Sequence, residues 1–433
     1  MSSIGHIIKS ERINQSMKQT TLAKGICSTS YLSKIENNFT VPSEEVITFL
    51  LKKLNIEIGQ VSSEKENKII ASLAELYKIG VLKRDKKFIR EFLQKLTNQK
   101  LHFLQLNNYY IYHLYLFRLL LILDEEEDLQ STYNVIVTIK DDIDDKQKFM
   151  INLNLGIYSY LNGNFQAALN RLEMSLGFIN NGINEEWEIA DFYNVLSLTY
   201  SKCNEFFNAI NYASKSLLYY KDNLLFERAI DNYIVIGIAH KEMRKFQEAE
   251  KNYNLAKKLA IDYKLNNYEE VIYQNLGSLH AIQGSHEKAI EFYKLSLQVK
   301  EEDCNAERYL LTILSIIKEY SKQSNHQQVL KWCQKGLDKI VEGKNSTKEY
   351  ISYFYHLEIY KHYHNLTDEL EMVLREAISY FENEQDERHV QKYSILLADY
   401  LFIHHKFKAA SLYYQKANQI LFKQKFIHKW EDL

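Results

Sequence analysis

An all-α fold in two parts is predicted by three features of the sequence: a small N-terminal helical domain, followed by a long array of helical hairpins. Proline occurs once, at Pro42, and only 13 of the 433 residues are glycine, which leaves too few turn residues for a β-rich fold. Two short helices joined by a tight turn are indicated at Gln19–Ser43. A repeat of 40 or 41 residues then runs through most of the remaining chain.

The N-terminal pattern begins with a short helix from about Lys18 that ends at Gly25. After a turn, the Ser28 hydroxyl can cap the second helix by accepting a hydrogen bond from its free backbone N–H groups. The small polar side chains that follow suit a helix that enters the major groove of DNA, because they let the backbone approach the base edges. A further helix follows, with Ser43 as its cap. We expect DNA contacts from Ser28, Thr29, Ser30, Tyr31, Ser33 and Lys34.

Residues 4–56 resemble the phage-repressor (Xre-type) helix-turn-helix domain. The stretch GICSTSYLSKIEN is similar to the version of that domain in the peptide-pheromone regulators of the PlcR/NprR group. The resemblance implies a five-helix DNA-binding domain over residues 1–62. It also implies that Arg12 pairs with Glu36 as a structural contact, and that Gln19 opens the second helix and contacts a DNA phosphate.

The charge of this domain bears on its oligomeric state. Residues 1–60 hold seven Lys or Arg side chains and five Asp or Glu side chains, a formal charge of +2. One copy of so weakly basic a domain should bind DNA weakly. We therefore expect a homodimer, or a higher homo-oligomer, that reads two half-sites of a double-stranded operator.

The repeat is clearest in four segments that begin at residues 153, 194, 234 and 274. A small residue recurs in the first predicted helix of each segment, and an alanine follows twelve residues later in the second. The first set is Gly156, Ser197, Gly237 and Gly277, and the second is Ala168, Ala209, Ala249 and Ala289. Small residues at both places allow two antiparallel helices to touch, and each hairpin can then bury a face against the next.

This motif resembles the tetratricopeptide repeat in the longer form of the same pheromone-regulator group, which implies a right-handed α-solenoid. Further apolar helix pairs at about 66–98 and 101–142 bring the expected total to about nine hairpins. We expect three regions: a helix-turn-helix domain at 1–62, a linker helix with divergent hairpins at 63–148, and a repeat array at 149–433 that binds peptide and dimerises.

The sequence shows none of the patterns that mark common catalytic or metal sites. It has no Gly-rich phosphate loop and no nucleophile on a strained turn. The pairs His362/His364 and His404/His405 lack the spacing that places two imidazoles on one helical face. We therefore expect a binding protein that is not an enzyme and needs no cofactor or metal. Without a signal-peptide pattern or a run of 18 apolar residues, the expected location is the cytoplasm, with no membrane partner.

An array of hairpins should present a hollow surface lined by the first helix of each hairpin, which suits an extended peptide. Such a peptide leaves its own N–H and C=O groups unpaired, and Asn or Gln side chains can satisfy both. Tyr193-Asn194 is also similar to the repeat by which PlcR-like proteins hold the pheromone backbone. The amide candidates are Asn194, Asn154, Gln274 and Asn275, and the charged candidates are Asp191, Asp231, Lys202 and Lys241. The alternative for each is a structural or surface role without a ligand.

These features together predict a cytoplasmic transcription regulator that is controlled by a short signalling peptide bound in the repeat array. The number of hairpins is closer to NprR than to PlcR, and that resemblance implies an alternative. In it the array is a protein-interaction module that binds a response-regulator phosphotransfer protein in sporulation control, and DNA binding is secondary. A phosphatase of the related Rap type is disfavoured, because the N-terminal residues match a DNA-binding unit instead.

Overall fold

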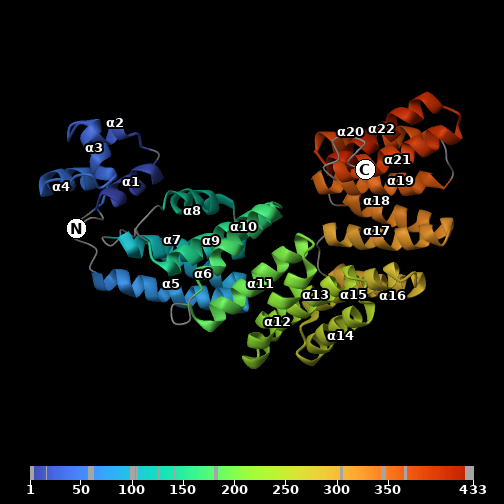
Figure 1. Cartoon of the computed structure of the whole chain (residues 1–433), viewed down its shortest axis with the longest axis horizontal. Helices are drawn as coiled ribbons and strands as arrows, with labels where there is room; N and C mark the ends of the chain where they lie inside the picture. The colour runs from blue at the N-terminus through green and yellow to red at the C-terminus, as the bar shows by residue number, and fades with distance from the viewer. Residues whose placement is uncertain are drawn as a thin grey trace. The chain divides into compact units, whose positions relative to one another are not determined.

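The structure is a computed structural model that describes the whole chain except residues 1–3, 16, 57–62, 98–102, 104–105, 125, 140–142, 180–183, 303–305, 343–347, 365–367 and 425–433. The elements of the described residues are helices (Figure 1). None of these helices is long and apolar enough to cross a membrane. The prediction of an all-α chain, with a helix-turn-helix unit followed by helical repeats, is confirmed.

Four helices form the N-terminal domain: α1 (Ile4–Asn14), α2 (Gln19–Ala23), α3 (Thr29–Glu36) and α4 (Glu44–Lys53). They enclose one small core. The buried side chains of that core are Ile7, Ile8, Leu22, Ala23, Leu32, Ile35, Leu50, Leu51, Leu54 and Ile56. These helices are four of the five expected, and residues 57–62, where the domain was expected to end, lie outside the described part.

The remaining helices follow one another as nine pairs within the described residues. The first three pairs are α5 (Ser63–Lys83) with α6 (Lys86–Thr97), α7 (Leu106–Leu123) with α8 (Glu126–Thr138), and α9 (Asp145–Leu161) with α10 (Phe165–Leu176). Next come α11 (Glu186–Lys202) with α12 (Phe206–Asp222), α13 (Phe226–Glu242) with α14 (Phe246–Asp262), and α15 (Glu269–Ile282) with α16 (His286–Glu302). The last three are α17 (Ala306–Lys322) with α18 (His326–Glu342), α19 (Lys348–Tyr363) with α20 (Asp368–Asn383), and α21 (Glu387–Ile403) with α22 (Phe407–Gln424).

The small residues Gly156 and Gly277 lie where the two helices of a hairpin touch, as the sequence predicted. A Cβ atom added at Gly156 would lie 2.8 Å from the Leu172 side chain, and one at Gly277 would lie 2.6 Å from the Tyr293 ring. Both distances are below van der Waals contact, so a larger residue would push the two helices of the hairpin apart. The turn inside the hairpin also recurs in the five successive hairpins from α9/α10 to α17/α18, with a positive φ at Gly163, Asn204, Arg244, Gly284 and Ser324.

The chain divides into two compact units, residues 1–252 and 253–433. In the first unit the first helices of successive hairpins, α5, α7, α9, α11 and α13, pack against one another in order, and α11 also contacts α5. Their apolar faces form one continuous core that includes Tyr77, Phe117, Phe149 and Phe192. In the second unit, separate cores lie between α16 and α19 and between α19 and α22.

Candidate functional site

The first candidate site is the exposed face of α3 in the helix-turn-helix domain. Ser28 caps this helix as predicted, because its hydroxyl oxygen accepts a hydrogen bond of 3.1 Å from the Tyr31 backbone N–H. Leu32 and Ile35 are buried against the other helices. The opposite side of α3 is therefore turned to solvent. Ser28, Thr29, Ser30 and Lys34 are exposed there, while Tyr31 and Ser33 are half-buried.

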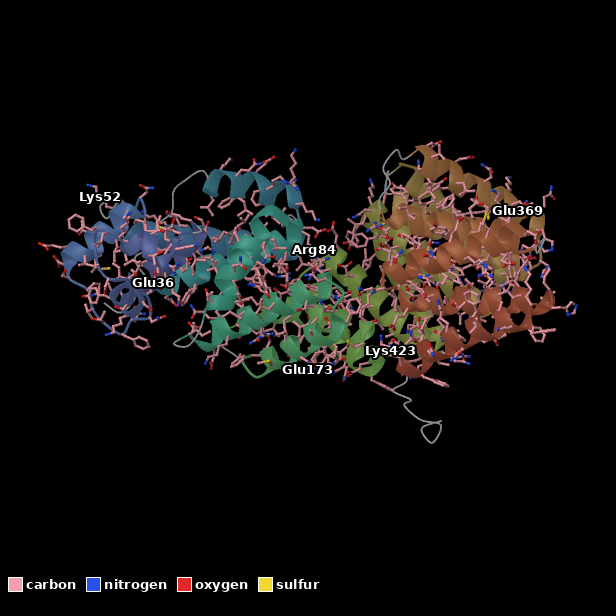
Figure 2. All side chains as sticks on the ribbon, turned by 90° about the horizontal axis from the view of Figure 1, so that it is seen from above. Glu36, Lys52, Arg84, Glu173, Glu369 and Lys423 are labelled. Atoms are coloured by element: carbon pink, nitrogen blue, oxygen red, sulfur yellow. The ribbon has the colours of Figure 1, made fainter. Side chains whose placement is uncertain are left out.

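Glu36, the last residue of α3, is completely buried and lies among the helices of the N-terminal domain (Figure 2). Arg12 of α1 donates two hydrogen bonds to its carboxylate, from Nε at 2.6 Å and from Nη2 at 2.9 Å. Gln19 of α2 donates a third, at 2.7 Å. Arg12 thus sits where the resemblance placed it, in a contact that joins α1, α2 and α3. The Gln19 amide carries two hydrogens, and its bond to Glu36 uses one of them.

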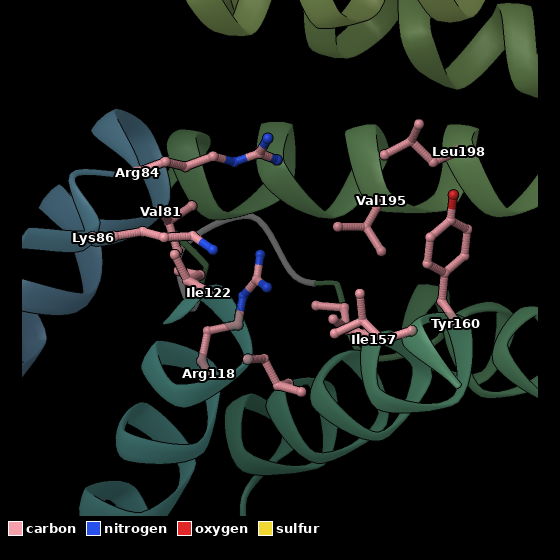
Figure 3. Close-up of a pocket in the computed structure, with 11 residues that line it drawn as sticks. Val81, Arg84, Lys86, Arg118, Ile122, Ile157, Tyr160, Val195 and Leu198 are labelled. Carbon is pink, nitrogen blue, oxygen red and sulfur yellow. The ribbon is translucent and has the colours of Figure 1, made fainter. Parts of the chain in front are cut away.

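The second candidate site is a cavity of about 270 Å³ among the first helices of the hairpins in the first unit (Figure 3). Three cationic side chains enter it: Arg84 just after α5, Lys86 at the start of α6, and Arg118 of α7. The rest of the lining is apolar apart from the Tyr160 hydroxyl. These residues are Val81, Leu121, Ile122, Ile157, Tyr160, Leu161, Val195 and Leu198.

A buried network of charges supports one side of this cavity. Asp191 of α11 is 1% exposed and accepts a 2.6 Å hydrogen bond from Arg118 and a 2.7 Å hydrogen bond from Arg228 of α13. Arg228 also bonds the Tyr220 hydroxyl at 2.9 Å. Asp231 extends the network, since it lies 3.2 Å from Arg84 and 3.7 Å from Arg228. The network ties α5, α7, α11 and α13 together.

The pKa values in this network follow from burial and from the neighbouring charges. Burial alone would raise the pKa of Asp191, but the charges of Arg118 and Arg228 outweigh it and lower that pKa below its usual value. The pKa of Arg84 is lowered, mainly by desolvation on burial and to a smaller extent by the positive charge of Arg228. Asp191 therefore stays ionised, and the cations around it repel one another.

Asn154 and Asn194 are both 1% exposed. Asn154 donates a 2.9 Å hydrogen bond to the Leu114 carbonyl of α7. Asn194 is different, because neither its amide oxygen nor its amide nitrogen has a hydrogen-bond partner among the described residues. A buried amide without partners costs about 1–3 kcal/mol, so a ligand or water would be stabilised there.

Asn194 is not among the residues that line this cavity. The sequence analysis placed Asn194 on the groove side, but on α11 the cavity is lined by Val195 and Leu198. Asn194 lies three residues before Ser197, and three residues of an α-helix span about 300°. Asn194 is therefore within about 60° of Ser197, the small residue of the first helix. Both residues are buried.

The other predicted ligand-binding residues are engaged within the protein. In the second unit, Gln274 donates to the Ser315 hydroxyl at 3.2 Å and accepts from the Thr312 hydroxyl at 2.8 Å, and Asn275 donates to the Val271 carbonyl at 2.8 Å. In the first unit, Lys202 Nζ lies 5.6 Å from the centre of the Phe165 ring, and Lys241 lies 3.3 Å from Glu242. None of these four side chains lines the cavity.

The sequence analysis missed the three cations that line the cavity, Arg84, Lys86 and Arg118, and also Arg228, which bonds Asp191. One signal for them was present. Arg118 is the only charged residue in the apolar segment Leu114–Leu123, and a buried arginine needs an acidic partner. That partner, Asp191, lies 73 residues further along the chain, where helical periodicity cannot point to it.

Metal coordination is not indicated by the described residues, which contain no group of three or more His, Cys, Asp or Glu side chains placed to hold an ion. The histidines that the sequence analysis considered have other contacts. His364 lies 3.3 Å from the Ser321 hydroxyl, and His404 lies 2.9 Å from the Tyr400 carbonyl oxygen.

Comparison with known proteins matches both parts of the chain. The helix-turn-helix family model matches residues 8–61, and a tetratricopeptide-repeat model matches residues 271–303, which span α15 and α16. The transcriptional activator NprA of Geobacillus stearothermophilus is 28% identical over 405 residues, which are 92% of this chain and 98% of NprA. The resemblance to the pheromone-regulator group is confirmed.

Further relatives are similar to parts of this chain. Regulatory protein RapG of Bacillus subtilis is 21% identical over 202 residues, 46% of this chain and 55% of RapG. Among solved structures, the apo form of the quorum sensor NprR from B. thuringiensis aligns with a TM-score of 0.69 at 18% identity, and covers 82% of this chain and 99% of its own. A Rap protein complexed with competence and sporulation factor aligns with a TM-score of 0.62 at 17% identity, over 84% and 99% of the two chains. At these identities the structural likeness shows a shared fold.

Proposed function

We propose that this chain is a cytoplasmic transcription regulator that binds operator DNA through its N-terminal domain and is controlled by a short signalling peptide bound among its helical hairpins. The exposed polar face of α3 carries the first half of the proposal. The cavity lined by Arg84, Lys86 and Arg118 carries the second. The similarity to a transcriptional activator over 92% of the chain supports the combination.

The DNA-binding half rests on how α3 is held. Its buried side packs on the domain core, and its last residue, Glu36, is fixed by Arg12 and Gln19. The start of the helix presents Thr29 and Ser30 to solvent, which are short hydroxyl side chains able to bond base edges. We assign this activity to residues 1–62. We assign peptide binding to the hairpins, including those at 63–148, because Arg84, Lys86 and Arg118 lie there.

The peptide half rests on two buried side chains with polar atoms that are unpaired among the described residues: Arg118 lines the cavity, and Asn194 is next in sequence to Val195, which also lines it. The Asn194 amide is buried without a partner, and Arg118 has a buried Nε without a hydrogen-bond acceptor among the described residues. Such groups are costly unless something binds them. Another protein with this fold binds a peptide: the structure of NprR in complex with its cognate peptide NprX aligns with a TM-score of 0.57.

A homodimer completes the proposal, because a domain of formal charge +2 makes few phosphate contacts alone. The test is selection of binding sites from random duplex DNA by the full-length protein, followed by light scattering of the free and DNA-bound protein. We expect an enriched sequence with two half-sites and a protein dimer on it. Failure to enrich any sequence, or a monomer bound to a single half-site, would contradict the proposal.

A second candidate function is binding of a response-regulator phosphotransfer protein through the repeats. It is favoured by the match to RapG over 202 residues and by the alignment with the Rap protein at a TM-score of 0.62. Co-purification, read together with the DNA selection, distinguishes the two functions. Co-purification with phosphotransfer proteins of the same cell, by a chain that selects no DNA sequence, would support the second function over the first.

A further inference from the structure

We infer that the cavity at Arg84, Lys86 and Arg118 binds a carboxylate that is flanked by an aliphatic side chain. This inference rests on the proposed function, since it names the part of the signalling peptide that the cavity receives. The carboxylate can come from an acidic side chain or from the C-terminus of the peptide. Both present the same two oxygens to the cations.

The charge balance of the site is the first argument. Its cations are Arg84, Lys86, Arg118 and Arg228, and the acids paired with them are Asp191 and Asp231. Among these six side chains, positive charges exceed negative ones by two. The cavity lining itself contains three cations and no acid. An anion inside the cavity would relieve a repulsion that the protein does not neutralise by itself.

The second argument is that two of the cations have donor capacity left. Lys86 contacts the Leu123 carbonyl at 3.4 Å and has no ion pair among the described residues. Arg118 uses Nη2 for Asp191, while its Nε is buried without a hydrogen-bond partner in the described part of the chain. A guanidinium has five N–H donors and an ammonium has three, so both groups can take a further acceptor.

The apolar wall supplies the third argument. Ile157, Val195 and Leu198 lie across the cavity from the cations (Figure 3). The cavity volume of about 270 Å³ is several times the roughly 30 Å³ that one water molecule occupies in the liquid. That space exceeds what a bare inorganic anion needs, and the wall would bury an aliphatic group beside the anion.

Backbone geometry at Arg84 agrees with a role for its side chain. Arg84 follows the last residue of α5 and has a φ of 51°, a conformation in which Gly or Asn is less strained. Its guanidinium bonds Asp231 at 3.2 Å and keeps 44% of the side-chain surface exposed. An arginine at this turn thus brings a solvent-reachable charge to the cavity.

The test compares four small probes on the full-length protein by ligand-observed NMR titration. N-acetyl-leucine and N-acetyl-leucyl-aspartyl amide each carry a carboxylate next to an aliphatic group. N-acetyl-leucinamide and N-acetyl-leucyl-asparaginyl amide are the matched probes without it. We expect at least one acid to bind about tenfold more tightly than its amide. Preference for N-acetyl-leucine identifies a C-terminal carboxylate as the source, and preference for the aspartyl probe identifies an acidic side chain.

Two variants connect that preference to the cavity. Lys86→Met removes a charge without breaking an ion pair, and Arg84→Asn removes another with a residue that tolerates positive φ. Each should weaken the acid probe about fivefold and leave the amide probe unchanged. Lys87→Met, on the adjacent exposed residue outside the lining, is the matched control and should keep the preference.

Equal binding of acids and amides would overturn the inference, as would an absence of acid binding or a preference that survives both substitutions. Its failure can be told from failure of the proposed function. A genome-encoded peptide that changes DNA binding, in a protein that shows no acid preference, overturns this inference alone. An acid preference in a protein that selects no DNA sequence supports this inference and overturns the proposed function.

Discussion

Replacing Asp191 should destabilise the first unit more than any other single change to its charged residues. Its carboxylate lies between Arg118 at 2.6 Å and Arg228 at 2.7 Å, and the side chains of these two arginines are only 7% and 2% exposed. Asp191→Asn removes the negative charge and leaves both cations buried. Removing one partner of a buried ion pair costs about 3–5 kcal/mol. Because the two pairs share one carboxylate, their costs do not add, and we expect about 3–5 kcal/mol in total.

Hydrogen–deuterium exchange resolved by peptide is the suitable assay, because two compact units need not unfold together. A loss of about 3 kcal/mol raises the open population by roughly a hundredfold, since each 1.4 kcal/mol is a factor of ten. We expect faster exchange in α7, α11 and α13. Asp222→Asn, at an exposed residue, should leave exchange unchanged. Protection that stays at the wild-type level in the Asp191 variant would refute the reasoning.

A compensating variant tests whether uncompensated charge is the cause. The triple change Arg118→Met, Asp191→Leu and Arg228→Met removes all three charges and fills similar volume. Such replacements are often neutral or stabilising, so most of the lost protection should return.

The pH dependence of the stability that Asp191 contributes has a defined sign. The lowered pKa of Asp191 means that its contribution is complete above about pH 4, the usual Asp value, and is lost as the pH falls below it.

Three further changes test the remaining assignments. Arg12→Ala removes two hydrogen bonds from the completely buried Glu36 and should lower the stability of the N-terminal domain by about 3 kcal/mol. We expect faster hydrogen–deuterium exchange in α1 and α3. Normal exchange with lost DNA affinity would instead make Arg12 a DNA contact. Thr29→Ala with Ser30→Ala should relax sequence preference by about 1–3 kcal/mol per lost base contact, measured against random DNA, and full discrimination would contradict the assigned register. Asn194→Ala should weaken the cognate peptide about tenfold in calorimetry and leave DNA binding intact, whereas equal affinity would place the peptide elsewhere.

Local features of this fold could be predicted from the sequence because local chemistry determines them. Ser28 and Ser43 cap their helices as expected, since a cap involves residues only three positions apart. The close approach of Gly156 to Ala168 was also readable, because the repeat shows a small residue in the first helix and an alanine in the second at fixed spacing. These features require no knowledge of how distant hairpins pack.

The cavity could not be predicted in the same way. Its charges come from turns and helices that lie far apart in sequence: Arg84 pairs with a residue 147 positions away, and Arg118 with one 73 positions away. Periodicity identifies the buried face of each helix but not which buried polar residues meet. The sequence analysis therefore selected Asp191 and Asp231 as charged candidates and missed the arginines that pair with them.

The position of the network suggests how a ligand could act on the array. A ligand shifts a conformational equilibrium only as far as its affinities for the two states differ. Asp191 and Asp231 connect α5, α7, α11 and α13 through their arginines, so the spacing of those helices determines how closely the cations approach one another. A carboxylate held by Arg84, Lys86 and Arg118 would favour the arrangement in which these cations are close. Loss of the ligand would favour a wider one, because the excess positive charge is then unopposed. The excess positive charge that would select an anionic ligand would thus also make that ligand bind the two helix arrangements with different affinities, and regulation by a ligand requires such a difference.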